Sequence, residues 1–273
     1  MKIKDLLKEE PNIDKNIKKL VLFQLLNVNN SELILKSDEE LSTKLLKTYK
    51  KILNKYKKGL PIQYILKETY FLGNKFYVDK NVLIPRPETE YLVIKTNELI
   101  EKHLKDDIEI VDIATGSGII AITLKKLNNK YNLTATDISS KALKVAKKNA
   151  KFHKTDIKFI KGDLLKPLKN KYNVLISNPP YIPYDSNNVE DIVKSNEPKI
   201  ALYAKNNGLY CYQEILKNAN KILEKNNIIA FETGENEHKE IINLAKTYFP
   251  NSKIMSEKDL NGYERYIYII NKE

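Results

Sequence analysis

The chain has 273 residues, of which 42% are hydrophobic, enough for one large domain or for a small domain beside a medium one. Its formal net charge is +12, but all except two of the 47 basic residues are lysines spread along the chain, so the charge does not indicate a nucleic-acid groove. One cysteine excludes an internal disulfide, three scattered histidines do not predict a metal site, and neither a membrane-length apolar run nor a secretion signal is found.

The first 60 or so residues predict helices only. Apolar residues from Ile13 to Leu26 share one broad face. The pattern Ser37-x-x-Glu40 is typical of a capping box and predicts the start of a further helix, which Gly59 ends. A bundle of this size is marginally stable alone, so we expect it to dock on a larger body.

Two short apolar runs flank Gly73-Asn74, a dipeptide that favours a two-residue hairpin turn. Pro87 fits the first turn of a helix running through Leu99. We interpret the hairpin as a connector. The predicted organisation is a helical substrate-recognition domain at residues 1–69, a hairpin linker at 70–85 and a larger domain at 86–273.

From about residue 108, strand-like and helix-like segments alternate, which predicts a parallel sheet with helices packed on it. We expect a helix near residues 209–223 and strands near residues 109–113, 132–136, 157–161, 173–177 and 228–233. The segment 182–207 is too long and too polar for a simple connection. We expect it to line the access to a substrate.

A glycine-rich turn, from Asp112 to Gly118, joins the first of these strands to an apolar helix. Glycines let the backbone approach a ligand, and a helix start offers free N–H groups, as in nucleotide sites. Asp137, at the end of the next strand, can accept both hydroxyls of a ribose. For each aspartate the alternative is a local capping role. A carboxylate before the turn suits the sulfonium of S-adenosylmethionine better than the pyrophosphate of NAD.

The tetrapeptide Asn178-Pro179-Pro180-Tyr181 follows the strand near 173–177. Its prolines stiffen the backbone and remove two donors, which leaves an amide at one end, carbonyl acceptors in the middle and a ring at the other end. Such a loop can grip a planar amide or amine: Asn178 Oδ1 and the Pro179 carbonyl would accept its two hydrogens and Tyr181 would stack on it. The alternative is an ordinary turn.

Taken together, these residues resemble a known family. Asp112, Gly116, Gly118, Asp137, Asp163 and the Asn-Pro-Pro-Tyr tetrapeptide are similar to class I S-adenosylmethionine-dependent methyltransferases that modify amide or amine nitrogens. The release-factor glutamine methyltransferases are the branch that the remaining motifs resemble: Pro61–Ile65, Leu83–Glu90, Asn196-Glu197-Pro198, Glu232-x-Gly234 and Asp259-x-x-Gly262-x-x-Arg265.

The resemblance implies a Rossmann-like seven-stranded α/β domain, preceded by the small helical domain and the hairpin, with one antiparallel strand in the closing pair near Lys253–Ser256 and Arg265–Ile270. It implies a cytoplasmic enzyme that uses S-adenosylmethionine to methylate the glutamine amide nitrogen in the Gly-Gly-Gln motif of peptide-chain release factors. No stable nucleic-acid partner, membrane or metal is expected.

The resemblance also implies roles for single residues. Asn178, Pro179 and Tyr181 would be catalytic. The cofactor would contact Asp112, Ala114, Thr115, Gly116, Ser117, Gly118, Asp137, Asp163, Leu164 and Asn178. The substrate would contact Asn178, Pro179, Pro180, Tyr181, Arg86 and Glu197.

Three positions depart from the family pattern. Ala114 and Lys67 stand where the family commonly has glycine, and Leu164 takes a place that is often aromatic. Both arginines, Arg86 and Arg265, fall in family motifs, where a planar guanidinium is not replaced by lysine. The alternative for each arginine is a structural pair with a nearby carboxylate.

Other functions stay open on the residues alone. An adenine-specific DNA or RNA methyltransferase is the main alternative, because the same grip suits an exocyclic amine, although a paired base would have to be flipped out. A cofactor-binding scaffold without catalysis and an NAD-dependent oxidoreductase are the others. The helical domain and the motif at Ile84–Glu90 favour the protein substrate, by resemblance.

Overall fold

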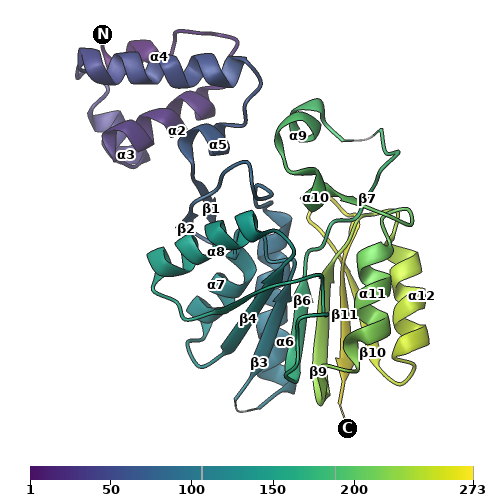
Figure 1. Ribbon diagram of the computed structural model, residues 1–273. Coiled ribbons are helices and arrows are strands. Elements are labelled where there is room, and N and C mark those ends of the chain that lie inside the picture. Colours follow the sequence, from purple (N-terminus) through teal and green to yellow (C-terminus); the bar gives the residue numbers. More distant parts are fainter. Residues whose placement is uncertain (106, 188, 273) are drawn as a thin grey trace. The chain divides into compact units, whose positions relative to one another are not determined.

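The computed structural model describes residues 1–105, 107–187 and 189–272. It forms two compact units (Figure 1). The first unit consists of Met1–Glu68 and Asp191–Asn196, and the second consists of Thr69–Glu190 and Glu197–Glu273. Each has a hydrophobic core of its own, so each is described by itself.

The first unit is helical, as the sequence predicts. Its helices are α1 (Ile3–Leu6), α2 (Lys15–Leu26), α3 (Asn30–Leu35), α4 (Thr43–Lys57), α5 (Ile62–Leu66) and α9 (Asp191–Asn196). Their apolar faces meet around Leu6, Leu22 and Tyr49. From α9, the side chain of Asn196 donates from Nδ2 to the carbonyl of Gly59 at 2.9 Å, just after α4 ends.

The predicted capping box at Ser37 was wrong. The helix that it was expected to open begins at Thr43, where the Ser42 side chain accepts from the N–H of Leu45. A capping box does exist, but at Asn29 and Glu32, where it opens α3. A polar side chain can accept from the first N–H groups of a helix from more than one position before an apolar run. Spacing alone therefore does not show which polar residue caps the helix.

The second unit begins with a hairpin of β1 (Thr69–Phe71) and β2 (Asn74–Phe76). Its turn residues are Leu72 and Gly73, both with positive φ, one position earlier than the sequence suggested. Phe71 and Phe76 are fully buried in the core of this unit. The hairpin is therefore packed as part of the larger body.

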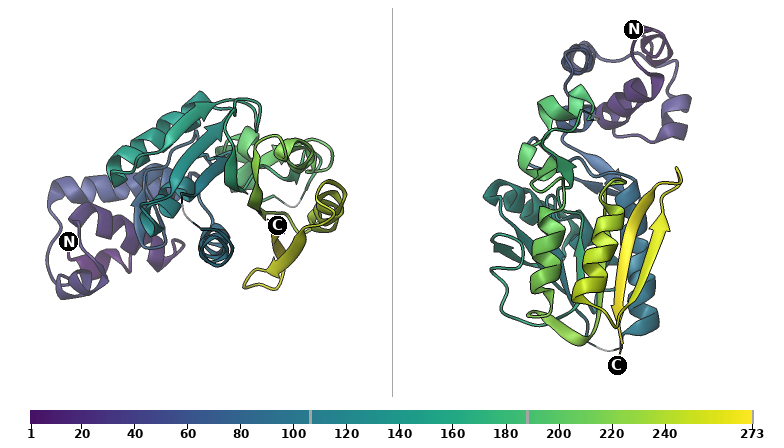
Figure 2. Two further views of the ribbon diagram at one scale, coloured as in Figure 1. Left: turned by 90° about the horizontal axis from the view of Figure 1, so that it is seen from below. Right: turned by 90° about the vertical axis from the view of Figure 1, so that its right-hand side faces the viewer.

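The main sheet has seven strands in the order β10-β11-β9-β6-β3-β4-β5. Two further views show the yellow C-terminal strands at one edge of the sheet (Figure 2). They are β3 (Glu109–Ile113), β4 (Asn132–Asp137), β5 (Lys158–Lys161), β6 (Tyr172–Ser177), β9 (Leu223–Glu232), β10 (Lys253–Lys258) and β11 (Glu264–Asn271). All neighbours are parallel except that β11 runs antiparallel to both β9 and β10. The seven-stranded Rossmann-like sheet and its single antiparallel strand are confirmed.

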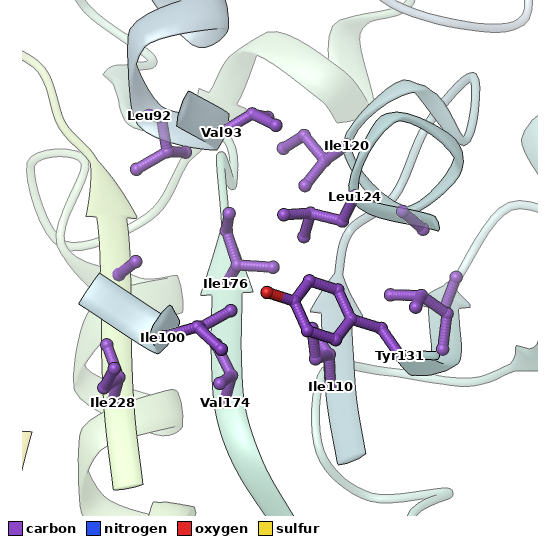
Figure 3. Packing of buried hydrophobic residues seen from close by; sticks show 14 of the residues in the cluster. Leu92, Val93, Ile100, Ile110, Ile120, Leu124, Tyr131, Val174, Ile176 and Ile228 are labelled. Atoms are coloured by element: carbon purple, nitrogen blue, oxygen red, sulfur yellow. The ribbon is translucent and has the colours of Figure 1, made fainter. Parts of the chain in front are cut away.

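Helices cover both faces of this sheet. On one face pack α6 (Glu88–His103), α7 (Ile119–Leu127) and α8 (Ser140–His153). Figure 3 shows Leu92 and Ile120 in one cluster with strand residues such as Ile110 and Ile176. On the other face pack α11 (Tyr210–Ala219) and α12 (His238–Tyr248), against Val111, Leu175 and Phe231. Strands buried on both faces explain the continuous apolar runs in the sequence.

The two ends of the segment 182–204, which follows β6, pair with each other in the second unit. Here β7 (Ile182–Pro183) pairs in parallel with β8 (Tyr203–Ala204), and the short helix α10 (Lys199–Leu202) precedes β8. Because β3, β4 and β6 are parallel neighbours, the turns that follow them meet at one edge of the sheet, where open α/β sheets bind ligands. Among the described residues, no helix is long and apolar enough to cross a bilayer.

Candidate active site

A cavity of about 340 Å³ lies at this edge of the sheet, a volume within the usual range of small-molecule sites. Nine of the residues singled out in the sequence line it: Ala114, Thr115, Gly116, Ser117, Asp137, Asp163, Leu164, Asn178 and Pro180. They come from four separate turns, after β3, β4, β5 and β6. Within the described chain, six other predicted residues lie outside the lining: Asp112, Gly118, Pro179, Tyr181, Arg86 and Glu197.

The glycine-rich turn leaves its backbone open to the cavity. Gly116 has φ of +55°, and a Cβ built on it would have no atom within 4 Å, so a ligand can approach the chain directly there. Gly118 has a different role. A Cβ on Gly118 would come within 3.0 Å of Ala146 Cβ, so this glycine allows α7 and α8 to pack closely.

Ala114 takes the left-handed conformation that its family position commonly gives to glycine. Its φ is +60°, where a Cβ crowds the backbone and costs about 1–2 kcal/mol. The strain is stored beside the cavity, at the first turn after β3. Lys67, the other departure from glycine, has the same feature, with φ of +59° at the end of α5.

Replacing Ala114 by glycine is therefore expected to raise the free energy of unfolding by about 1 kcal/mol, because glycine relieves the positive φ. Urea unfolding of the two forms measures the difference. Ala245→Gly in the middle of α12 is the matched control, and there the same change should lower stability by about 1 kcal/mol or more. A loss of stability at both positions would contradict the strain at Ala114.

Asp112 is completely buried at the end of β3. Its Oδ2 accepts from the Thr115 hydroxyl and from the N–H of Ala121 in α7, so it caps the turn as the structural alternative proposed. Its Oδ1, however, has no hydrogen-bond partner within the described part of the chain. Burial raises the pKa of Asp112 to about 7. A buried oxygen without a partner is unfavourable unless a ligand or water completes it, and contact of Asp112 with a bound cation stays a prediction.

Asp137 faces the cavity at the end of β4. One oxygen accepts from the N–H of Gly116 at 2.9 Å and the other from the N–H of Ser139 at 2.7 Å. Burial raises the pKa of this carboxyl group, and the two N–H donors oppose that shift. Each carboxylate oxygen keeps a second lone pair, so the side chain is held rigidly and can still accept from two hydroxyl groups.

Asp163 and Leu164 lie across the cavity, after β5. The Asp163 carboxylate pairs with Lys166 at 2.6 Å and is about one-third exposed, so its role beyond this ion pair stays a prediction. Gly162, which sequence reasoning missed, also lines the cavity, and a Cβ there would press on the ring of Pro167.

The tetrapeptide after β6 divides between the cavity and the core. Asn178 is half-buried at the cavity wall and donates from Nδ2 to the Thr89 hydroxyl at 3.2 Å. Pro179 is buried, whereas Pro180 lines the cavity. The Tyr181 ring packs against the apolar cluster under α11 and α12, and burial raises its pKa to about 12, so it stays a neutral phenol.

Two glycines make room for Tyr181. A Cβ on Gly208 would overlap the Tyr181 carbonyl oxygen, and a Cβ on Gly234 would come within 2.9 Å of the Tyr181 ring. Gly208 also has φ of +86°. The fixed position of Tyr181 therefore depends on glycines from two distant segments, one of which carries the Glu232-x-Gly234 motif.

Aromatic residues that the sequence did not single out also line the cavity. Tyr184 of the segment after β6 stacks on Tyr203 of β8, with ring centroids 5.5 Å apart and planes at 23°. Tyr184 is largely exposed. Thr89, Tyr210 and Cys211 are among the other lining residues that were not predicted as site residues. Their spacing in the sequence carries no signal, because different elements bring them to the cavity.

Both arginines pair with carboxylates. Arg86 donates to Glu197 Oε1 at 2.6 Å, and the other oxygen of Glu197 accepts from the N–H of Ile84. Arg265 donates to Asp259 at 3.2 Å and to the Thr233 carbonyl at 3.0 Å. These pairs fix the segments that carry them, and direct contact of Arg86 and Glu197 with a substrate stays a prediction. In the ranges that the structure describes, no group of three or more possible metal ligands is found.

Comparison with known proteins agrees with this arrangement. The family model of the methyltransferase small domain matches residues 93–259, and that of the PrmC N-terminal domain matches residues 2–66. A release factor glutamine methyltransferase of Bacillus cereus is 36% identical over 95% of this chain and 94% of its own length. That of Staphylococcus aureus is 43% identical over 77% of this chain and 75% of its own.

The chain belongs to the release factor glutamine methyltransferase family.

Solved structures share the fold of this family at low sequence identity. The ribosomal protein L11 methylase of Lactobacillus delbrueckii subsp. bulgaricus has a TM-score of 0.52 at 20% identity, over 72% of this chain and 84% of its own. The catalytic domain of hMettl16 has a TM-score of 0.57 at 16% identity, over 72% and 76%. Membership in the release factor glutamine methyltransferase family confirms the expected class of enzyme, a methyltransferase that uses S-adenosylmethionine.

Proposed function

We propose that this chain methylates the side-chain amide nitrogen of the glutamine in the Gly-Gly-Gln motif of peptide-chain release factors. The observation that carries the proposal is a single cavity in a member of this family, which joins the glycine-rich turn and Asp137 on one side to the Asn178 amide on the other. A methyl donor that carries a nucleoside and a planar amide that receives the methyl group can therefore bind side by side in this cavity.

The residues around the glycine-rich turn fit S-adenosylmethionine. Gly116 leaves its backbone open to the ligand, and Asp137 offers carboxylate oxygens for two hydroxyl groups. Leu164 offers an apolar side chain at the position where the family often has an aromatic ring. The buried Oδ1 of Asp112 fits a cationic or ammonium group near the turn. Ala114, Thr115, Ser117 and Asp163 are the other proposed cofactor contacts, and Gly118 supports them through packing. When bound, this cofactor supplies a methyl group that is already activated by a sulfonium.

The residues after β6 hold the acceptor. An amide nitrogen is a poor nucleophile because its lone pair is delocalised, so the protein must place it and exclude water. Asn178 Oδ1 and the Pro179 carbonyl accept the two hydrogens of the glutamine amide, and Pro180 and Tyr181 confine its plane. The clamp of Arg86 and Glu197 holds the neighbouring segment of this substrate site.

Mass spectrometry of a release factor incubated with the enzyme and labelled S-adenosylmethionine tests the function. We expect one methyl group on the glutamine of the Gly-Gly-Gln motif and none when that glutamine is alanine. DNA and RNA containing adenine are offered in parallel, because the same grip suits an exocyclic amine. Label in nucleic acid alone, or equal label in both protein forms, would overturn the proposal.

The first unit is proposed to recognise the release factor. It has its own core, and none of the residues that line the cavity comes from its described part. A shortened chain of residues 69–273 keeps the hairpin, whose phenylalanines belong to the core of the second unit. We expect it to bind S-adenosylmethionine within about threefold of the full chain, by calorimetry, while methylating release factor at least tenfold more slowly. Full activity of the shortened chain would refute this division of labour.

A further inference from the structure

A chain of side-chain hydrogen bonds runs from the cavity wall into the core of the second unit. Asn178 Nδ2 donates to the Thr89 hydroxyl at 3.2 Å, and that hydroxyl donates to Glu232 Oε2 at 2.7 Å. Asn178 and Thr89 line the cavity, while Glu232 lies behind them at the end of β9. Thr89 is 3% exposed and Glu232 is 2% exposed. No part of the proposed mechanism has used this buried carboxylate.

The direction of these hydrogen bonds determines which atom of Asn178 faces the cavity. An ionised carboxylate can only accept, so the one proton of the Thr89 hydroxyl must point to Glu232. The hydroxyl oxygen then has only lone pairs left for Asn178, which must offer an N–H group. The amide oxygen is thereby left free for the cavity.

We propose that Glu232 is a positioning residue, which acts through the Thr89 hydroxyl to hold the Asn178 amide with its oxygen toward the substrate nitrogen. The inference rests on the proposed function. The Asn178 oxygen must face the substrate only if the group that receives the methyl has N–H donors. An amide turned by 180° would present two donors to the glutamine NH₂ and repel it. Shape alone does not prevent this turn, since the two ends of an amide are nearly the same size.

The charge state of Glu232 makes the device sensitive to pH. Burial raises the pKa of Glu232 to about 7, while the Thr89 hydroxyl, the Arg265 charge and the Asn178 amide oppose the shift and Glu88 adds to it. The phenols of Tyr181, Tyr212 and Tyr266 also interact electrostatically with Glu232. Above pH 7 the carboxylate accepts and the amide is fixed. Below it the carboxyl group carries a proton, becomes a donor, and no longer dictates the orientation of Asn178.

Substitutions at Glu232 test the proposal by the split between kcat and KM. Glu232→Leu removes the acceptor, and we expect kcat for release factor to fall by roughly tenfold to a hundredfold, the effect of a misplaced reacting group, with the affinity for S-adenosylmethionine unchanged. Glu232→Gln is neutral and can donate as well as accept, like the protonated carboxyl group, so its kcat should lie near the low-pH value of the wild-type enzyme. Wild-type kcat should decline as the pH falls through about 7, and this decline should be absent in Glu232→Gln.

Substitutions at Thr89 give a second test that keeps the buried charge. Thr89→Val removes the hydroxyl at nearly constant volume and should lower kcat at least fivefold, whereas Thr89→Ser should retain it. Thr96→Val is the matched control. Thr96 is a buried threonine of the same helix, and its hydroxyl bonds only to the carbonyl of Leu92 among the residues that the structure describes. Thermal unfolding and cofactor binding of each variant separate loss of positioning from loss of fold.

The orientation is also measured without any substrate. In the full chain labelled with ¹⁵N-asparagine, the side-chain resonance of Asn178, assigned through Asn178→Ala, should shift with an apparent pKa near 7, and Glu232→Gln should abolish the shift. If the wild-type enzyme does not methylate release factor while this titration is present, the proposed function fails and the positioning by Glu232 stands. The inference would be overturned by an unchanged kcat in Glu232→Leu and Thr89→Val. It would also be overturned by an Asn178 resonance whose pH dependence is the same in wild type and Glu232→Gln.

Discussion

Replacing Asn178 by alanine is expected to abolish methyl transfer while leaving the cofactor in place. The turnover number should fall by about a hundredfold to a thousandfold, the usual effect of removing one preorganised polar group at a reacting centre. Affinity for S-adenosylmethionine should stay within about threefold, because the turn at Gly116 and the Asp137 carboxylate lie on other strands. Single-turnover assays with release factor and calorimetry with the cofactor measure the two quantities.

The control for this variant is Asn218→Ala. Asn218 lies on α11, and its side chain hydrogen bonds only with the Glu214 carbonyl and Lys221 among the described residues. Its turnover and cofactor affinity should both match the wild-type values. Near-full turnover in Asn178→Ala would mean that the amide clamp is wrong, whereas equal losses of turnover and cofactor affinity would place Asn178 chiefly in the cofactor site.

Replacing Asp137 by alanine is expected to have the largest effect on cofactor affinity. The carboxylate is held by the N–H groups of Gly116 and Ser139, so it meets a ligand without losing further conformational freedom. Loss of its charge-assisted hydrogen bonds should weaken S-adenosylmethionine binding by roughly 1.5–3 kcal/mol, or about tenfold to 150-fold in Kd. Calorimetry of the two forms measures this change.

Asp137→Asn separates the charge from the local turn. Asparagine keeps one oxygen for an N–H of the turn, so the variant should lose less affinity than Asp137→Ala and keep the wild-type melting temperature. Lys166→Ala, which removes an exposed partner of Asp163 on the far side of the cavity, should change the affinity little. If Asp137→Ala binds the cofactor normally, the assignment of this carboxylate to the ribose is wrong.

Much of this architecture could be predicted because the sheet and the turns leave local signals. Strands buried on both faces read as apolar runs, and each run that ends in Asp112, Asp137 or Asn178 marks the ligand edge of a parallel sheet. The left-handed turn at Gly116 and the stiff backbone of Pro179 are local as well. Such features need only the identity of a few neighbouring residues.

The parts that could not be predicted depend on contacts between distant residues. Thr89 and Glu232 are 143 positions apart, and nothing in either segment indicates the other. Tyr184 reaches Tyr203 through the two short strands of a segment that looked irregular. The helix start at Ser42 differed from the expected one because several hydroxyl side chains compete to cap the same helix.

The long separation of Thr89 from Glu232 has a consequence for synthesis. A ribosome releases β3, β4 and β6 well before β9, so a nascent chain that ends before residue 232 already has the glycine-rich turn and Asn178 but not the carboxylate behind them. β9 also separates β6 from β11, so the last strand cannot join the sheet without it. An incomplete chain should therefore acquire the donor side of the cavity first, and competence to transfer should arise only after Glu232, late in the 273-residue chain, has been added.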